Sequence, residues 1–193
     1  MTDNLLIKNI AKHITLTSEE EEHFLSLITS RKIKKKHFLS QEGDVSKGPV
    51  FVTKGILRSY TIDKNGFEHV LQFAPAGWWM ADMFSLVTQN PGYLNIDAIE
   101  DCDVLLLPKK ELDKLYKEIP AFEHFFRILA ENSLDTYQQR ITGILSLTAK
   151  ERYNNFCRSY PSLIESLPQK QVASYIGVTP EFLSKMLKSK NNK

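Results

Sequence analysis

The segment QKQVASYIGVTPEFLSKMLK, residues 169–188, restricts the fold of this chain more than any other part of the sequence. Its pattern predicts two short helices joined by a tight turn. Gly177 can adopt the left-handed conformation that ends a helix, and Thr179 can cap a second helix that has Pro180 at its first position. The small side chain of Ala173 would let the two helices cross closely. The spacing predicts a helix-turn-helix unit, with an ordinary helical hairpin as the alternative.

The remaining positions of this segment separate into an inner and an outer face. The apolar residues that we expect to face inward are Val172, Ile176, Val178, Leu183, Met186 and Leu187. The outward residues of the second helix, at helical spacing, are Thr179, Glu181, Ser184, Lys185 and Lys188. The second helix of a helix-turn-helix lies in the major groove of DNA. We therefore expect these outward residues to contact double-stranded DNA.

The outward residues suit different contacts with DNA. Glu181 can accept a hydrogen bond from a cytosine amino group, and Lys185 can reach guanine acceptors or a phosphate. Thr179 and Ser184 suit phosphate contacts, which position a helix without reading the base sequence. Glu181 has a structural alternative, because a carboxylate in the first turn of a helix interacts favourably with the helix dipole.

The charge distribution agrees with a nucleic-acid contact near this end of the chain. From Ile144 onward the sequence has eight Lys or Arg and three Glu, whereas the rest has 17 basic and 20 acidic residues. A basic module on a mildly acidic body is typical of nucleic-acid binding. The alternative is a solvated basic tail, since Lys188, Lys190 and Lys193 supply much of the excess.

Composition restricts the class of protein. A chain of 193 residues with 42% hydrophobic residues can build a real core in one large domain or two small ones. The sequence has no apolar run long enough to span a membrane, and its first residues lack the pattern of a signal peptide. Cys102 and Cys157 are far apart, and the five histidines have no metal-ligand spacing. We expect a cytoplasmic protein without a metal site.

The middle of the chain, from Ile33 to about Leu107, has the pattern of antiparallel β structure. Short β-rich runs alternate with turn signals, and the runs are KIKKKHFL, PVFVTKGI, LRSYTID, EHVLQFA, YLNIDAIE and DVLLLP. The turn glycines are Gly43, Gly55, Gly66 and Gly77. Asn65-Gly66 predicts a hairpin, because this pair tolerates positive φ. Regularly spaced short strands favour a sandwich or jelly-roll barrel over a parallel α/β sheet.

Helical patterns lie on both sides of this region. Before it, Thr17 or Ser18 can cap a helix that runs through Phe24. After it, a short helix that follows Pro108 would end before Pro120. The β-rich region is therefore expected between helices, in an α+β arrangement.

The segment PAFEHFFRILAENSLDTYQQRITGIL predicts one long helix. Its apolar stripe, with spacings of four and three residues, consists of Ala130, Leu134, Tyr137, Ile141 and Ile144. This coiled-coil-like spacing predicts pairing with the same helix of a second subunit, and packing on its own barrel is the alternative. Phe122, Phe125 and Phe126 suit contacts with the barrel. Gly143 would interrupt the helix and supply a hinge, or it is a tolerated helical glycine.

A β-roll, a long dimerising helix and a C-terminal helix-turn-helix, in this order, resemble the Crp/Fnr family of bacterial transcription regulators. The most specific residues are VASYIGVTPEFLSKMLK and the stretch APAGWWMADMFSL. The resemblance implies an antiparallel, cyclic nucleotide-binding-like β-roll with N-terminal helices at 1–118, a dimerisation helix at 119–145 and a DNA-binding domain at 146–193. Few residues follow Lys188, so we expect the wing hairpin of the family to be reduced or absent.

Family members that bind cyclic AMP use a cassette with a Gly-Glu pair and a later Arg followed by Ser or Thr. The resemblance places Ala81-Asp82 at the first pair and Gly92-Tyr93 at the second. Because Gly92 cannot neutralise a phosphate, we expect no ordinary cyclic-nucleotide binding. The pocket residues implied are Trp79, Ala81, Asp82, Met83, Gly92 and Tyr93. The bulky side chains here would fill the pocket or line a site for a more apolar ligand, and they are Trp78, Trp79, Met80, Met83 and Phe84.

These observations favour a homodimeric transcription regulator that reads a near-palindromic site. The resemblance implies double-stranded DNA, a second subunit, RNA polymerase and a small-molecule effector as partners, and no membrane. The alternative is a cyclic-nucleotide-type or other small-ligand-binding regulatory module without DNA-binding function. The sequence has no catalytic triad, P-loop or GxGxxG motif, so we do not expect an enzyme.

Overall fold

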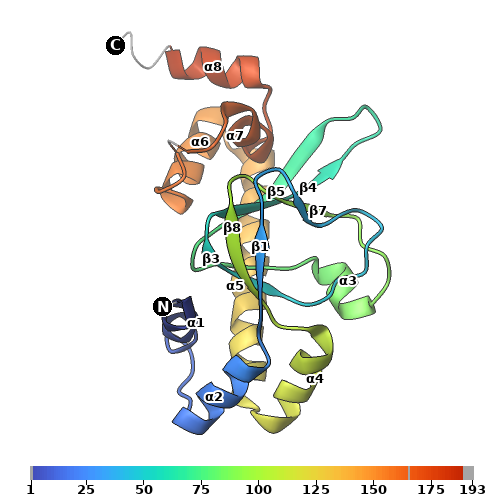
Figure 1. The fold of residues 1–193 in the computed structure, drawn as a ribbon. Helices are drawn as coiled ribbons and strands as arrows, with labels where there is room; N and C mark the ends of the chain where they lie inside the picture. The colour runs from blue at the N-terminus through green and yellow to red at the C-terminus, as the bar shows by residue number, and fades with distance from the viewer. Residues whose placement is uncertain (1, 165, 189–193) are drawn as a thin grey trace. The chain divides into compact units, whose positions relative to one another are not determined.

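The computed structural model describes residues 2–164 and 166–188, which form two compact units. The barrel unit consists of Met1–Ser59 and Phe73–Asn132, and the helical unit consists of Tyr60–Gln72 and Ser133–Lys193. Figure 1 shows the order of the elements, with the strands between helices at both ends of the chain. None of the described helices is long and apolar enough to cross a membrane.

Within the described residues, eight strands form two four-stranded sheets. One sheet has the order β1-β8-β3-β6, with β1 at Thr29–Ile33, β8 at Cys102–Leu106, β3 at Val50–Lys54 and β6 at Trp79–Met80. The other has the order β2-β7-β4-β5, with β2 at Phe38–Ser40, β7 at Asn95–Ala98, β4 at Ile56–Ile62 and β5 at Glu68–Pro75. Strands β1 and β3 both pair antiparallel with β8, which confirms the predicted antiparallel fold class. Apolar side chains from both sheets form one core cluster.

A second core cluster joins β3 and β8 to four helices of the barrel unit. These helices are α1 (Thr2–Ile10), α2 (Ser18–Ser26), α4 (Lys109–Glu118) and the first half of α5 (Ala121–Ser146). Phe24, Phe122 and Phe125 are fully buried in this cluster, and the rings of Phe24 and Phe122 stack with centroids 4.6 Å apart. The predicted barrel contacts of Phe122 and Phe125 are therefore confirmed.

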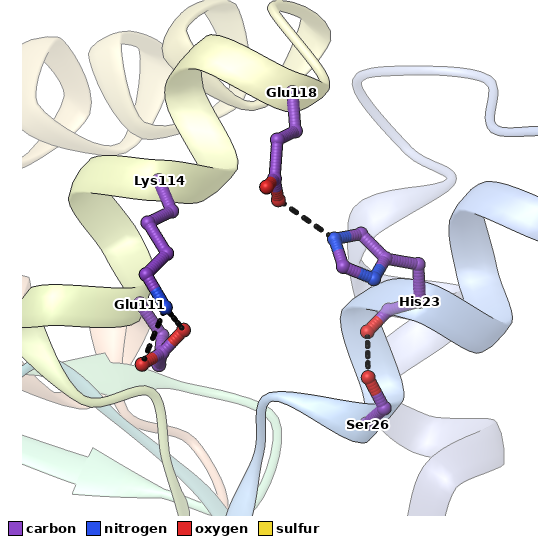
Figure 2. Close-up of polar contacts among 5 residues, drawn as sticks. All are labelled: His23, Ser26, Glu111, Lys114 and Glu118. Carbon is purple, nitrogen blue, oxygen red and sulfur yellow. Dashed lines mark hydrogen bonds and ion pairs between the residues drawn. The ribbon is translucent and has the colours of Figure 1, made fainter.

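Helix α2 begins with the predicted cap. Thr17 accepts a hydrogen bond from the N–H of Glu20, and the Glu20 side chain accepts one from the N–H of Thr17. Later in α2, His23 Nε2 lies 2.8 Å from Glu118 Oε2 of α4, as Figure 2 shows. Ser26 donates to the carbonyl of His23. The pair of His23 and Glu118 is exposed to solvent, so its contribution to stability is small.

The helical unit contains the second half of α5, α6 (Ala149–Ser159), α7 (Gln169–Ile176), α8 (Pro180–Lys188) and residues 60–72 of the β4–β5 hairpin. The rings of Phe156, Tyr160 and Tyr175 pack together with centroids 5.4 to 5.6 Å apart. The predicted hairpin turn is present, with Gly66 at a φ of 82°.

Three local expectations differ from the structure. The run KIKKKHFL does not form one strand, because Lys36 has a φ of 66° in the turn between β1 and β2. The short strand β6 and the helix α3 (Met83–Thr88) follow Gly77 and were not predicted. Helix α5 runs through Gly143 without interruption, because a single helical glycine costs only about 1 kcal/mol and the helix is long.

Candidate DNA-binding face and ligand pocket

The turn between α7 and α8 has the geometry that its sequence predicted. Gly177 is left-handed, with a φ of 71° and a ψ of 46°, and it ends α7. The N–H of Val178 donates to the carbonyl of Ala173 at 3.0 Å, which satisfies one of the last carbonyls of the helix. Thr179 caps α8, because its Oγ1 accepts from the N–H of Phe182 at 3.2 Å. Residues 169–188 therefore form two helices joined by a tight turn.

Helix α8 has one buried side and one exposed side. Leu183 is fully buried, and Met186 and Leu187 are partly buried. The predicted outward residues are exposed, except for Ser184, which is half-buried; the exposed ones are Thr179, Glu181, Lys185 and Lys188. Their contacts with DNA stay a prediction. The expectation of a reduced wing concerns residues 189–193, which lie outside the part of the chain that the structure describes.

Two arginine side chains donate hydrogen bonds to backbone carbonyls at the C-terminal end of α7. Arg140 of α5 donates from Nε and Nη2 to the carbonyl of Tyr175 at 3.1 and 2.8 Å, and its guanidinium lies 4.1 Å from the centroid of the Tyr175 ring. Arg152 of α6 donates from Nε to the carbonyl of Ile176 at 2.7 Å. Burial lowers the pKa of Arg140, but a guanidinium stays charged in proteins. Both cations therefore stabilise the carbonyl end of α7.

The β4–β5 hairpin is bonded to the same helix. Ser174 Oγ of α7 donates to the carbonyl of Glu68 at 2.6 Å and accepts from the N–H of Val70 at 2.9 Å. Arg140 also donates to the carbonyls of Val70 and Leu71, each at 2.6 Å. One hydrogen-bond network thus joins α5, α7 and β5. Sequence reasoning did not single out Arg140 or Ser174, because their partners lie 35 to 106 residues away in the sequence.

The predicted dimerisation stripe of α5 is mostly exposed. Leu134 and Ile141 are 59% and 58% exposed. Tyr137 is half-buried, and burial raises the pKa of its hydroxyl. The exposed members of the stripe are Ala130, Leu134, Ile141 and Ile144. Leu145, which is also exposed, extends this apolar surface and was not part of the prediction. Exposed apolar side chains at this spacing are typical of a site of protein association.

The carboxylate of Asp82 is hydrogen-bonded within the segment where the resemblance places the cassette. Asp82 is buried, and its two carboxylate oxygens accept from the N–H groups of Ser85 at 3.1 Å and Leu94 at 3.3 Å. The Gly92 N–H donates to the carbonyl of Asp44 at 2.9 Å. A Cβ at position 92 would lie 2.3 Å from Asp82 Oδ2. These backbone N–H groups are therefore already paired within the chain.

A pocket of about 340 Å³ lies in the barrel unit. Of the predicted pocket residues, Ala81 and Asp82 line it, together with Arg31 and Lys47. The other predicted residues are not part of its lining, and these are Trp79, Met83, Gly92 and Tyr93. Among residues 2–164 and 166–188, no group of His, Cys, Asp and Glu side chains could hold a metal ion.

Strand alternation explains why Trp79 does not fill the pocket. Successive side chains of a strand point to opposite faces, so Trp79 and Met80 of β6 separate. Met80 lines the pocket and belongs to the core between the sheets. Trp79 instead packs against Phe51, with ring centroids 5.2 Å apart, and donates from Nε1 to Asn9 at 3.0 Å. The other bulky residues of this region are exposed, and they are Trp78, Met83 and Phe84.

The barrel also contains a buried ion pair that the sequence did not predict. Arg58 of β4 donates from Nε and Nη2 to the two carboxylate oxygens of Asp97, at 2.8 and 2.9 Å. Both residues are buried. A bidentate pair of this kind neutralises the guanidinium within the protein. Arg58 is therefore already paired with a carboxylate.

The chain resembles known proteins in sequence and in fold. A family model of the cyclic nucleotide-binding domain matches residues 30–118. The chain is 21% identical to the regulatory protein HlyX of Actinobacillus pleuropneumoniae, over 95% of this chain and 81% of that protein. It is 24% identical to the fumarate and nitrate reduction regulatory protein of Vibrio cholerae, over 94% and 76% of the two chains. These relatives are regulatory proteins, in agreement with the prediction that the chain is not an enzyme.

Solved structures share the fold. FixK2 from Bradyrhizobium japonicum has a TM-score of 0.74 at 20% identity, over 86% of this chain and 85% of that one. The c-di-GMP-responsive global regulator CLP of Xanthomonas campestris also has a TM-score of 0.74, at 14% identity, over 91% and 92%. A transcriptional regulator of the crp/fnr family from Eubacterium rectale has a TM-score of 0.71 at 17% identity, over 90% and 83%. The likeness covers both units of the chain.

Proposed function

We propose that the chain is a transcription regulator of the Crp/Fnr family, a cytoplasmic homodimer that reads a near-palindromic DNA site through α8. The observation that carries this proposal is the division of α8 into two faces. Leu183 is fully buried against the rest of the unit, whereas Glu181 and Lys185 are exposed. The outward face would enter the major groove, where Glu181 and Lys185 would read base edges.

A second copy of the chain would cover the apolar stripe of α5. Leu134 and Ile141 are seven residues apart, as in the seam of a coiled coil, and both are more than half exposed. Dimerisation through α5 would bring two α8 helices to half-sites about 34 Å apart, one turn of DNA. RNA polymerase is the partner that we propose for the DNA-bound dimer.

In this proposal the barrel does not bind cyclic nucleotides in the way that is usual for the family. The carboxylate of Asp82 already uses two backbone N–H groups of the cassette, and Arg58 is paired with Asp97. Placing a cyclic phosphate next to the buried carboxylate of Asp82 would be unfavourable, because the two negative charges would repel each other. The pocket with Arg31 and Lys47 in its lining supports a different small effector.

The same pocket favours the second candidate function, a small-ligand-binding module without DNA binding. Titration of the full chain with random-sequence duplex DNA at two salt concentrations separates the two functions. A DNA reader loses affinity steeply as salt rises, and Lys185→Ala should weaken binding and reduce the salt slope by about one. Lys117→Ala, at an exposed lysine of the barrel unit, is the matched control. Absence of any salt-dependent affinity would favour the second candidate.

A further inference from the structure

Phe182 stands out on the exposed side of α8. Its side chain is 53% exposed, whereas that of the next residue, Leu183, is fully buried. The backbone at Phe182 is fixed, because its N–H donates to Oγ1 of Thr179. A large aromatic residue is thus more than half exposed in the first turn of the helix, next to Glu181. Packing inside the unit covers less than half of this residue.

The position of Phe182 relative to the polar residues indicates what it would meet. Residues three apart on a helix are neighbours, so Phe182 and Lys185 lie on adjoining parts of the outward face. If Glu181 and Lys185 read base edges, Phe182 enters the same groove beside them. The apolar group that the major groove offers is the C5-methyl group of thymine, and phenylalanine is one of the side chains that contact it.

We infer that Phe182 is a specificity-determining residue that selects thymine through apolar contact with its C5-methyl group. This inference rests on the proposed function, because it places α8 in the major groove. Glu181 and Lys185 recognise hydrogen-bonding groups, so they cannot distinguish thymine from uracil. Phe182 adds a distinction that depends on the methyl group alone.

The contact with the methyl group can be tested by replacing thymine with uracil in the DNA. In vitro selection with the full wild-type chain supplies a duplex site, and each thymine of that site is then replaced singly by uracil. Uracil keeps the base pair and lacks only the methyl group. We expect one thymine in each half-site at which uracil weakens binding about fourfold, the equivalent of burying one methyl group. Phe182→Ala should bind the thymine and uracil duplexes equally.

Two control variants test whether the uracil effect depends on Phe182 and not on DNA binding or on exposed phenylalanines in general. Lys185→Ala should weaken binding to both duplexes and keep the distinction between thymine and uracil. Phe67→Ala, at a 65%-exposed phenylalanine in the hairpin turn, should leave both affinities and their ratio unchanged. Circular dichroism of Phe182→Ala checks that the helices are retained.

The possible outcomes separate this inference from the proposed function. If no uracil substitution affects the wild type, or if Phe182→Ala keeps the effect, the inference is overturned while DNA binding stands. A chain that selects no DNA sequence at all overturns the proposed function and this inference together. If uracil weakens binding of the wild type and of the two control variants, but not of Phe182→Ala, the result supports both the proposed function and this inference.

Discussion

A Cβ atom at position 92 would lie 2.3 Å from the Oδ2 oxygen of Asp82, so Gly92 is the residue that leaves room for the buried carboxylate. We therefore expect Gly92→Ala to lower the free energy of unfolding by about 1–3 kcal/mol, because the side chain of Asp82 must shift away from its two N–H donors. Denaturation in urea measures the change.

Gly143→Ala is the matched control for this substitution. A Cβ at position 143 would lie 3.5 Å from Cδ1 of Leu147, an ordinary contact, and the residue is helical. We expect this variant to gain up to about 1 kcal/mol from the better helix propensity of alanine. Equal effects of the two substitutions would contradict the proposed fit between Gly92 and Asp82.

The same cassette predicts the response to cyclic nucleotides. Calorimetric titration of the folded protein with cyclic AMP and then cyclic GMP, at low micromolar protein concentration, should give no saturable heat. The reason is that Asp82 accepts from Ser85 and Leu94 where a phosphate would need donors. Saturable heat with either nucleotide would mean that the cassette binds a phosphate without an arginine at position 92.

The sequence predicted the parts of this fold that depend on neighbouring residues. Gly177 and Thr179 act within a few positions of themselves, so the turn between α7 and α8 and the cap of α8 could be read from the sequence. The contact between Gly92 and Asp82 could not, because it depends on how the chain folds back after α3. Strand β6 was missed for a different reason, since two residues are too few to show an alternating pattern.

Arg140 joins three segments, and its removal should destabilise the helical unit. Arg140→Ala would leave the carbonyls of Val70, Leu71 and Tyr175 without their charged donor. We expect a loss of about 2–3 kcal/mol in the free energy of unfolding, because hydrogen bonds to charged groups contribute more than neutral ones. Arg127→Ala removes an exposed arginine that pairs with Glu131, and its effect should stay within about 0.5 kcal/mol. Similar losses in both variants, measured in urea, would contradict a special role for Arg140.

Protonation of Asp63 in acid should destabilise the hairpin turn between β4 and β5. A hydrogen bond from His69 and further bonds from the N–H groups of Phe67 and Asn65 hold the pKa of Asp63 below its ordinary value. Because the pKa is lower in the folded state, the stabilisation is complete above the ordinary value of about 3.9 and is lost as pH falls through the folded pKa. The difference in melting temperature between the wild type and Asp63→Asn should therefore shrink as pH falls below about 5. A difference that stays constant down to pH ~2 would contradict this assignment.

Charges placed on the stripe of α5 should separate the subunits. Leu134→Glu combined with Ile141→Glu puts like charges on both helices of the proposed seam, where they would repel and lose apolar burial. Both residues are more than half exposed in the single chain, so each subunit should keep its fold by circular dichroism. Sedimentation at micromolar concentration should change from two chains to one, and affinity for a two-half-site duplex should fall steeply because the half-sites are no longer linked. Val87→Glu, at an exposed residue of α3, should remain dimeric. A double variant that still sediments as a dimer would mean that another surface joins the subunits, and the exposed stripe would then need a different partner.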